Sequence, residues 1–252
     1  MKRKQYDCDS CRFQFSVRVE TAFEGSHLPL WKWFLATYLM IESRKGMSAN
    51  QLKRTLGVSY KTAWFLCHRI RWAMGEGQDA KLHGTVEIDE TYVGGKWRYP
   101  NVKEKTTVLG AIERNGRVVF RVEGKHRATR EMLHKFVSDV VADDAEAIFT
   151  DGHPGYIGIG DEDTRHEWVS HAQEEWVRGE VHTNTVENVW SLLDRSIMGS
   201  FHQLSVKHLP AYLDEIAFRF NNRKNPFLFR DTILKLIEAD PLTYAQLVVQ
   251  KD

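Results

Sequence analysis

The sequence predicts an α/β fold in which a mixed sheet flanked by helices follows an all-α N-terminal region. Apolar residues recur at helical spacing over residues 30–74, and short segments typical of strands begin at residue 85. One further helical segment lies between the third and fourth of these strands, and others follow the last strand. With 252 residues and 42% hydrophobic content, the chain can bury the core of one large domain with a small accessory module.

The first 25 residues predict a small hairpin. Cys8 and Cys11 form a tight Cys-x-x-Cys knuckle, and alternating apolar residues follow it. A structural zinc site takes four ligands, usually from two such knuckles. We therefore interpret residues 1–25 as a partial zinc ribbon. Either its other half lies upstream of Met1, which would make Zn²⁺ a cofactor of the longer protein, or the pair is a relic; Cys67 is interpreted as a buried thiol.

Residues 26–77 predict a helix-turn-helix region. Helices are expected over residues 30–43, 49–56 and 60–74, with Ser48 as an N-cap and Gly57 in the turn. In a helix-turn-helix the second helix enters the major groove of DNA. The polar face of the third helix supplies three candidate DNA-binding residues: Lys61, Arg69 and Arg71.

Charge is distributed unevenly along the chain. Residues 1–77 contain thirteen Lys and Arg and six Asp and Glu, a net charge of +7; because the whole chain carries +1, the remaining residues carry −6. A basic front on an acidic body favours a polyanion-binding module attached to a carboxylate-rich domain. The longest early apolar stretch, residues 28–41, is interrupted by Lys32 and is too short to span a bilayer, so we expect no membrane partner and a cytoplasmic location.

After a linker at residues 75–79, the pattern changes to that of a sheet domain. Strands are expected over residues 85–89, 106–113, 117–123, 145–150 and 167–171, and helices over residues 130–141, from Thr185 onward, 207–221 and 231–239. Three meandering strands, a helix, two further strands and a helix is the order of an RNase H-like fold. We assign residues 80–223 to this domain and residues 224–252 to a C-terminal helical tail.

Three carboxylates lie where this order would bring them together. Asp89 ends the first predicted strand, Asp151 ends the fourth, and Glu187 lies on the first turn of the long helix. Such a cluster of oxygen ligands suits two Mg²⁺ or Mn²⁺ ions, which can stabilise both the attacking and the leaving oxygen of a phosphodiester. We expect Asp89 to bridge the two ions.

Other residues near this cluster receive different roles. Strand alternation leads us to expect that Glu87 and Glu90 point away from Asp89 and are poorer ligands. Trp190 is expected to pack beneath the site. The Gly94-Gly95-Lys96 segment is interpreted as a flexible turn in which Lys96 contacts DNA.

The residues around the three carboxylates point to a family. Thirty-five residues separate Asp151 from Glu187, which resembles the D-35-E arrangement of DDE transposases and retroviral integrases. The segments at residues 87–96, 150–153, 182–190 and 218–223 resemble those of bacterial insertion-sequence transposases with an N-terminal zinc ribbon and helix-turn-helix.

This resemblance implies a reaction and its partners. Such enzymes bind the terminal inverted repeats of their element, cut DNA to expose 3′-OH ends, and transfer these ends to target DNA. The implied partners are double-stranded DNA and further copies of the chain in a synaptic complex. Some related elements use Asn as the third ligand, so Asn184 is an alternative to Glu187. The family usually has Lys seven residues after the Glu; this chain has Asp194 there, and Arg195 beside it is the candidate phosphate contact.

Two other functions stay open at this point. Asp194 and the single knuckle would also fit a catalytically degenerate copy that only binds the terminal repeats as a repressor. Another RNase H-like nuclease, such as a junction resolvase, would share the acidic site but would have no need of an appended helix-turn-helix.

Overall fold

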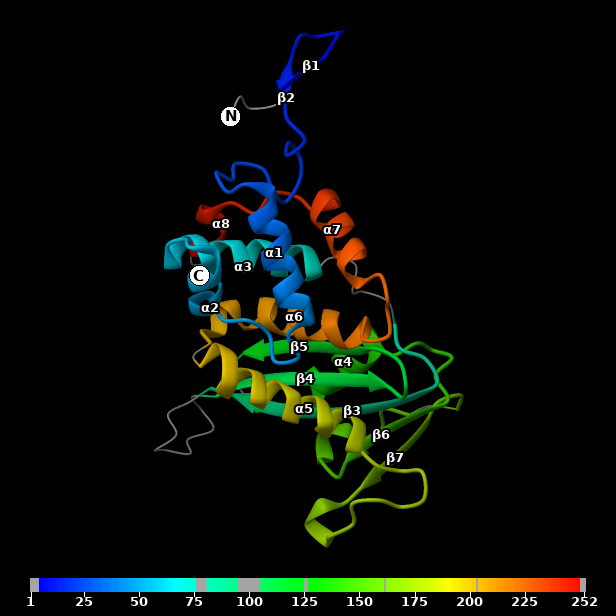
Figure 1. The fold of residues 1–252 in the computed structure, drawn as a ribbon. Helices are drawn as coiled ribbons and strands as arrows, with labels where there is room; N and C mark the ends of the chain where they lie inside the picture. Colours follow the sequence, from blue (N-terminus) through cyan, green and yellow to red (C-terminus); the bar gives the residue numbers. More distant parts are fainter. Residues whose placement is uncertain are drawn as a thin grey trace. The chain divides into compact units, whose positions relative to one another are not determined.

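A computed structural model describes residues 5–75, 81–94, 105–124, 127–160, 162–202 and 204–249. The chain divides into two compact units: Met1–Glu76 together with Lys224–Asp252, and Gly77–Arg223 (Figure 1). In the described part of the chain, no helix combines the length and the apolar character needed to cross a membrane.

The first unit is mainly helical. Its elements are the strands β1 (Tyr6–Asp7) and β2 (Gln14–Phe15) and the helices α1 (Leu30–Glu42), α2 (Ala49–Leu56), α3 (Tyr60–Gly75), α7 (Leu228–Glu238) and α8 (Tyr244–Val248). The helix α7 packs against α1 and α3, and the backbone N–H of Ala22 donates to the carbonyl of Leu236. The segment that the sequence sets apart as a C-terminal tail therefore belongs to the same compact unit as the N-terminal helices.

The turn between α2 and α3 follows from local sequence. The Ser48 side chain accepts a hydrogen bond from the N–H of Gln51, which caps the start of α2. Gly57 ends this helix with φ of 59°, a left-handed conformation that glycine adopts without steric cost. The buried side chains Leu52 and Leu56 bring α2 onto α3.

The second unit is built on a five-stranded mixed sheet with the order β5-β4-β3-β6-β7. The strands are β3 (Thr85–Val93), β4 (Thr106–Glu113), β5 (Val118–Gly124), β6 (Ala147–Asp151) and β7 (Arg165–Val169). The first three pair antiparallel, whereas β6 is parallel to both β3 and β7. This is the RNase H-like topology that the sequence predicts, and the mixed α/β fold is confirmed.

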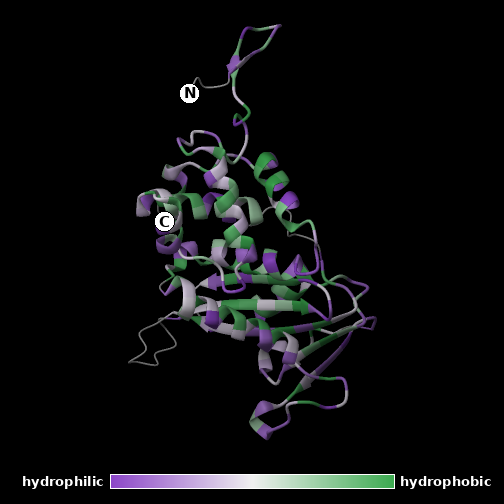
Figure 2. Ribbon diagram, viewed as in Figure 1, coloured by the Kyte–Doolittle hydropathy of each residue, from purple (hydrophilic) through white to green (hydrophobic). Residues whose placement is uncertain are grey.

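Helices cover both faces of this sheet. Helix α4 (Arg130–Val140) packs with Leu133 and Phe136 against one face, around Ile88. Helices α5 (Asn184–Ser196) and α6 (Leu209–Asn221) cover the other face, where Val189 packs against β4. Both faces of β4 are therefore buried, and Figure 2 shows that the central strands are largely hydrophobic.

One strand is longer than the sequence predicts. β3 continues four residues beyond Asp89 to Val93 because β4 pairs with it along this whole length. Its parallel pairing with β6 stops at Glu87. The sequence predicts Asp89 at the end of its strand, but Asp89 lies inside β3. At Asp89, β3 pairs with β4 and no longer with β6.

Candidate active site

Asp89 is held by two hydrogen bonds on β3. Its Oδ2 atom accepts from Nε1 of Trp190 at 2.9 Å, and its Oδ1 atom accepts from the backbone N–H of Glu90 at 2.8 Å. Burial, followed by the charges of the nearby carboxylates Glu90 and Asp151, raises the pKa of Asp89 to about 8. The site therefore favours binding a proton or a cation over keeping a bare carboxylate.

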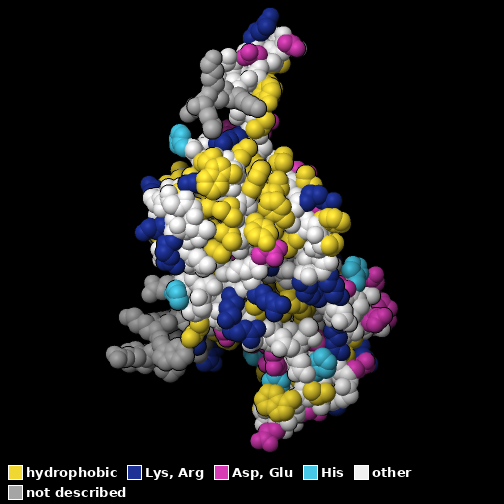
Figure 3. Space-filling view, in the orientation of Figure 1, with side chains coloured by type: hydrophobic (Ala, Val, Ile, Leu, Met, Phe, Trp, Pro, Cys, Tyr) yellow, Lys and Arg dark blue, Asp and Glu magenta, His cyan; other side chains and the backbone are white. Residues whose placement is uncertain are grey.

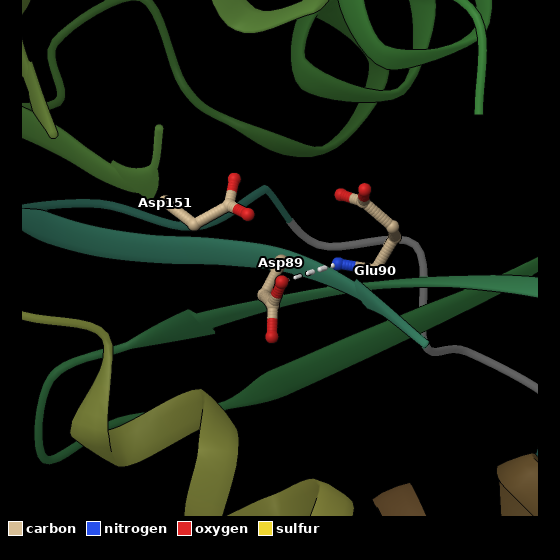
Figure 4. A group of neighbouring side chains, drawn as sticks. All are labelled: Asp89, Glu90 and Asp151. Carbon is tan, nitrogen blue, oxygen red and sulfur yellow. Dashed lines mark hydrogen bonds between the residues drawn. The ribbon is translucent and has the colours of Figure 1, made fainter. Parts of the chain in front are cut away.

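Asp151 and Glu90 complete a group of three carboxylates. One oxygen of each residue lies within 4.8 Å of the others (Figure 4). Asp151 ends β6 as predicted, and its Oδ1 atom accepts from the backbone N–H of His153. Glu90 accepts a hydrogen bond from the Tyr156 hydroxyl at 2.9 Å. Burial, followed by the charge of Asp151, raises the pKa of Glu90.

The expectation that Glu90 is a poorer ligand than Asp89 is not supported by this geometry. Alternation does send Glu90 to the other face of the sheet, where it meets Tyr156. However, the pairing of β3 with β6 ends at Glu87, so at Asp89 and Glu90 no strand of the described residues lies beside β3 on the β6 side. Asp151, at the end of β6, is consequently close to both side chains of β3.

The expectation that Glu87 points away from Asp89 is wrong, since the two residues are two positions apart on β3 and share a face, although Glu87 lies outside the group of three carboxylates. The Glu87 side chain is fully buried. It accepts hydrogen bonds from the backbone N–H groups of Thr185 (2.7 Å) and Val186 (3.1 Å), from the Thr185 hydroxyl, and from Nε of Arg114 (2.7 Å). Glu87 thus attaches the N-terminus of α5 to β3, where the partial positive charge of the helix favours a carboxylate.

The third predicted ligand, Glu187, lies outside the group of three carboxylates. Its Oε1 atom accepts from the Thr183 hydroxyl at 2.9 Å and lies 3.6 Å from Nε2 of His171. Asn184, the alternative ligand, is exposed at the first position of α5. The structure therefore brings Asp89 and Asp151 together as predicted, with Glu90 as their neighbour, and leaves Glu187 outside this group.

Trp190 connects α5 to the acidic group more directly than the sequence indicates. Besides packing in the core, its indole covers Gly110, the residue of β4 that lies opposite Asp89. A Cβ atom on Gly110 would lie 2.6 Å from Cζ2 of Trp190, closer than real Cβ contacts. The indole can therefore reach Asp89 only because residue 110 has no side chain. A Gly between β-branched and aliphatic residues of a strand is the sequence signal for such an approach.

This contact gives a first testable prediction. Gly110→Ala should displace the Trp190 indole, remove its hydrogen bond to Asp89 and lower the melting temperature, with an expected cost of about 1–3 kcal/mol for overpacking. Gly152→Ala is the matched control, because its added Cβ would have no neighbour closer than 3.6 Å. Thermal unfolding followed by circular dichroism measures both. Equal melting temperatures for the two variants would show that the indole does not need this space.

The predicted DNA-binding residues fall into three groups. Arg69 and Arg71 are only 4% and 2% exposed, so the expectation that they lie on an exposed polar face of α3 is wrong; the second half of α3 is the central helix of its unit. Lys61 is exposed, with Nζ 4.4 Å from the centre of the Tyr244 ring. Arg195 is also exposed and donates to the Ser191 hydroxyl. Lys96 lies outside the described residues.

The Cys8–Cys11 segment has the geometry of a knuckle. The turn is closed by hydrogen bonds from the N–H of Cys8 to the carbonyl of Phe13 and from the N–H of Arg12 to the carbonyl of Cys8. Hydrogen bonds from the backbone at Cys11 and Ser10 lower the pKa of the Cys8 thiol, which favours the thiolate that binds zinc. Within the described residues, no third side chain with a metal-binding atom groups with these two cysteines.

A mixed sheet of RNase H-like order with acidic side chains at its centre defines a class of fold and site shared by many nucleases and strand transferases. The model of one family, the ISXO2-like transposase domain, matches residues 81–221. This match covers more than half of the chain, so the protein belongs to this transposase family.

A curated relative agrees with this assignment. The chain is 31% identical over 233 residues to an uncharacterized protein in the transposable element ISH50 of Halobacterium salinarum, covering 86% of this chain and 78% of the relative.

Solved structures show only a distant likeness. The Mos1 strand transfer complex matches with a TM-score of 0.37 and 11% identity over 85% of this chain and 77% of that one. A chain of the simian T-cell lymphotropic virus intasome matches with a TM-score of 0.32 and 14% identity over 67% of this chain, and this chain spans less than two thirds (63%) of its length. The fold assignment therefore rests on the strand order and the family match.

Proposed function

We propose that the protein is a metal-dependent DNA transposase that cuts DNA at the ends of an insertion sequence and joins the resulting 3′-OH ends to target DNA. The observation that carries this proposal is the approach of Asp89 and Asp151 on adjacent strands of a transposase-family domain. The binding of DNA, the cleavage and the strand transfer are all part of the proposal.

The acidic residues fit hard divalent cations. Their donor atoms are carboxylate oxygens, which Mg²⁺ and Mn²⁺ prefer over the nitrogen and sulfur ligands of zinc. Burial and mutual repulsion raise the pKa values of Asp89 and Glu90, so a divalent cation placed among these carboxylates would offset their repulsion. When bound, two such ions would activate a nucleophile and stabilise the leaving oxygen of a phosphodiester.

Within this proposal, Asp89 and Asp151 hold the ions and Glu187 is the third ligand. The spacing of thirty-five residues from Asp151 supports Glu187, as does its position one turn before Trp190, whose indole contacts Asp89. Glu87 fixes α5 on β3, so only the Glu187 side chain has to turn away from Thr183 and His171. Asn184 stays the alternative ligand on the same turn.

The helical unit supplies the DNA-binding surface in this proposal. The pair α2–α3 would act as a helix-turn-helix, with exposed residues at the start of α3, among them Lys61, entering the major groove of the terminal repeats. Arg195 on α5 would contact a phosphate near the cut. Arg69 and Arg71 are not included, because both are buried.

Cleavage of a labelled oligonucleotide that carries the element's end tests the proposal and the choice of third ligand. Glu187→Gln should reduce Mg²⁺-dependent nicking by at least about 10²-fold, the size of effect seen when one charge-stabilising group is lost. Glu90→Gln is the matched control, since it keeps shape and hydrogen-bonding capacity and should retain most of the activity. The opposite ranking of the two variants would assign the third ligand to Glu90.

A repressor without catalytic activity is the second candidate, favoured by the position of Glu187 outside the acidic group and by Asp194 in the place of a Lys. Wild-type protein that binds the terminal repeat but never nicks it, with either Mg²⁺ or Mn²⁺, would support this candidate over the transposase.

A further inference from the structure

Helices α1 and α7 together present an exposed apolar face. In α1 the exposed side chains are those of Trp31, Phe34, Tyr38 and Glu42, of which three are aromatic. They follow helical spacing, so they lie on one side of the helix. The opposite side, which includes Trp33 and Met40, is buried in the unit. Helix α1 is thus apolar on both sides, which is unusual for a helix at the surface of a monomer.

Helix α7 extends this face. Its exposed apolar side chains are those of Phe229, Leu234 and Ile237. The rings of Tyr38 and Phe229 meet edge to face at 6.1 Å, so the two helices form one continuous surface. Figure 3 shows hydrophobic side chains gathered in a single patch over α1 and α7. We call these six residues the α1–α7 face: Trp31, Phe34, Tyr38, Phe229, Leu234 and Ile237.

The size of the α1–α7 face matches an interface between proteins. Its six side chains are 38–58% exposed. Because one aromatic side chain can bury about 150–250 Å², the exposed part of the face amounts to roughly 500 Å² of mainly apolar surface. A contiguous apolar patch of this size is at the upper end for a monomer. It also forms most of the surface of roughly 800 Å² that one partner contributes to a stable interface.

We infer that the α1–α7 face binds the same face of a second copy of this chain. Its six side chains are uncharged, and the exposed charged residues beside them on the same helices include both signs, such as Glu42 and Arg230, so the surface does not present the cluster of Lys and Arg side chains that a DNA backbone requires. Two adjacent helices form a ridged surface that can pack against itself around a two-fold axis, which gives a four-helix interface. This inference rests on the proposed function in one respect: joining two element ends requires two DNA-binding units held together.

Sedimentation equilibrium of the full chain, without DNA or metal, tests the inference. Wild-type protein should dimerise, and Trp31→Glu or Leu234→Glu should weaken dimerisation by at least about 30-fold, as expected for a central interface residue. Both side chains are about half exposed, so the fold should persist. Trp168→Glu is the matched control, because Trp168 is 52% exposed on β7 of the other unit and should leave dimerisation unchanged.

Two outcomes would overturn the inference: a monomeric wild-type protein at micromolar concentration, or dimers of both Glu variants as tight as those of the wild type. The outcome is separate from that of the proposed function, because dimerisation is measured without cleavage. If both proposals hold, Trp31→Glu should still nick a single element end and should lose only the concerted joining of two ends. Retained concerted joining by a monomeric variant would contradict the role given to this face.

Discussion

Replacing Asp89 by Asn should abolish Mg²⁺-dependent cleavage and at the same time make the metal-free protein more stable. The first effect follows because Asn carries no charge to bind an ion shared with Asp151. The second follows because the wild-type carboxylate is buried beside Glu90 and Asp151. Asn removes this repulsion and keeps one oxygen that accepts from Trp190, and we expect this relief to exceed the loss of the hydrogen bond from the Glu90 N–H. We expect a loss of activity of at least about 10²-fold.

The stability effect should depend on pH in a defined direction. The folded protein raises the pKa of Asp89 to about 8, so the folded state binds this proton more tightly than the unfolded state does. The unfolded carboxyl has a pKa of about 3.9. Wild-type stability should therefore be lost as pH rises from about 4 to 8, and the advantage of Asp89→Asn should grow over this range. Each 1 kcal/mol relieved raises the melting temperature by about 2–4 °C.

Melting curves at pH 5 and pH 8, with and without Mg²⁺, measure this effect. Asp143→Asn is the matched control, because the Asp143 carboxylate is fully exposed and lies outside the acidic group. Mg²⁺ should raise the melting temperature of the wild type and of this control but not that of Asp89→Asn. A variant less stable than the wild type in metal-free buffer at pH 8 would contradict the repulsion inferred for Asp89.

Glu87→Ala should destabilise the sheet unit more than any other single replacement considered. It would leave the N–H groups of Thr185 and Val186 and the guanidinium of Arg114 without their buried carboxylate. Removing one partner of a buried ion pair costs about 3–5 kcal/mol. Urea denaturation should show this loss. Glu180→Ala, which removes an exposed carboxylate that pairs with Arg165, is the control and should leave the urea midpoint nearly unchanged, because water screens the pair.

A milder variant separates the effect on stability from the effect on position. Glu87→Gln keeps the shape and one acceptor, so it should fold but hold α5 less firmly. We expect it to require more Mg²⁺ for half-maximal cleavage, because Glu187 is carried by α5. If Glu87→Gln has the same urea midpoint as the wild type and needs the same Mg²⁺ concentration for half-maximal cleavage, Glu87 does not position this helix.

The strand order and the pairing of Asp89 with Asp151 could be predicted because both depend on local signals. Alternating residues mark each strand, and an acidic residue ends β6. What could not be predicted depends on where neighbouring strands stop. β3 outlasts its pairing with β6, which makes Glu90 a neighbour of Asp151 although alternation sends it to the other face.

The roles of buried charges were equally hidden in the sequence. In the sequence, Glu87 is one more acidic residue near Asp89. Only the structure shows that its carboxylate accepts hydrogen bonds from the N-terminus of α5. Arg69 and Arg71 fit the polar face of an isolated helix, yet α1 and α7 pack around α3 and bury them. In each case the environment is set by an element distant in sequence, which periodicity within one helix or strand does not report.

The most direct test of the central claim is the anomalous scattering of crystals of the full chain grown with Mn²⁺. We expect an anomalous peak between Asp89 and Asp151, within about 2.0–2.4 Å of carboxylate oxygens of both residues, and the Glu187 side chain turned toward it. The absence of a peak at these carboxylates in a Mn²⁺-saturated crystal would contradict the proposed metal centre.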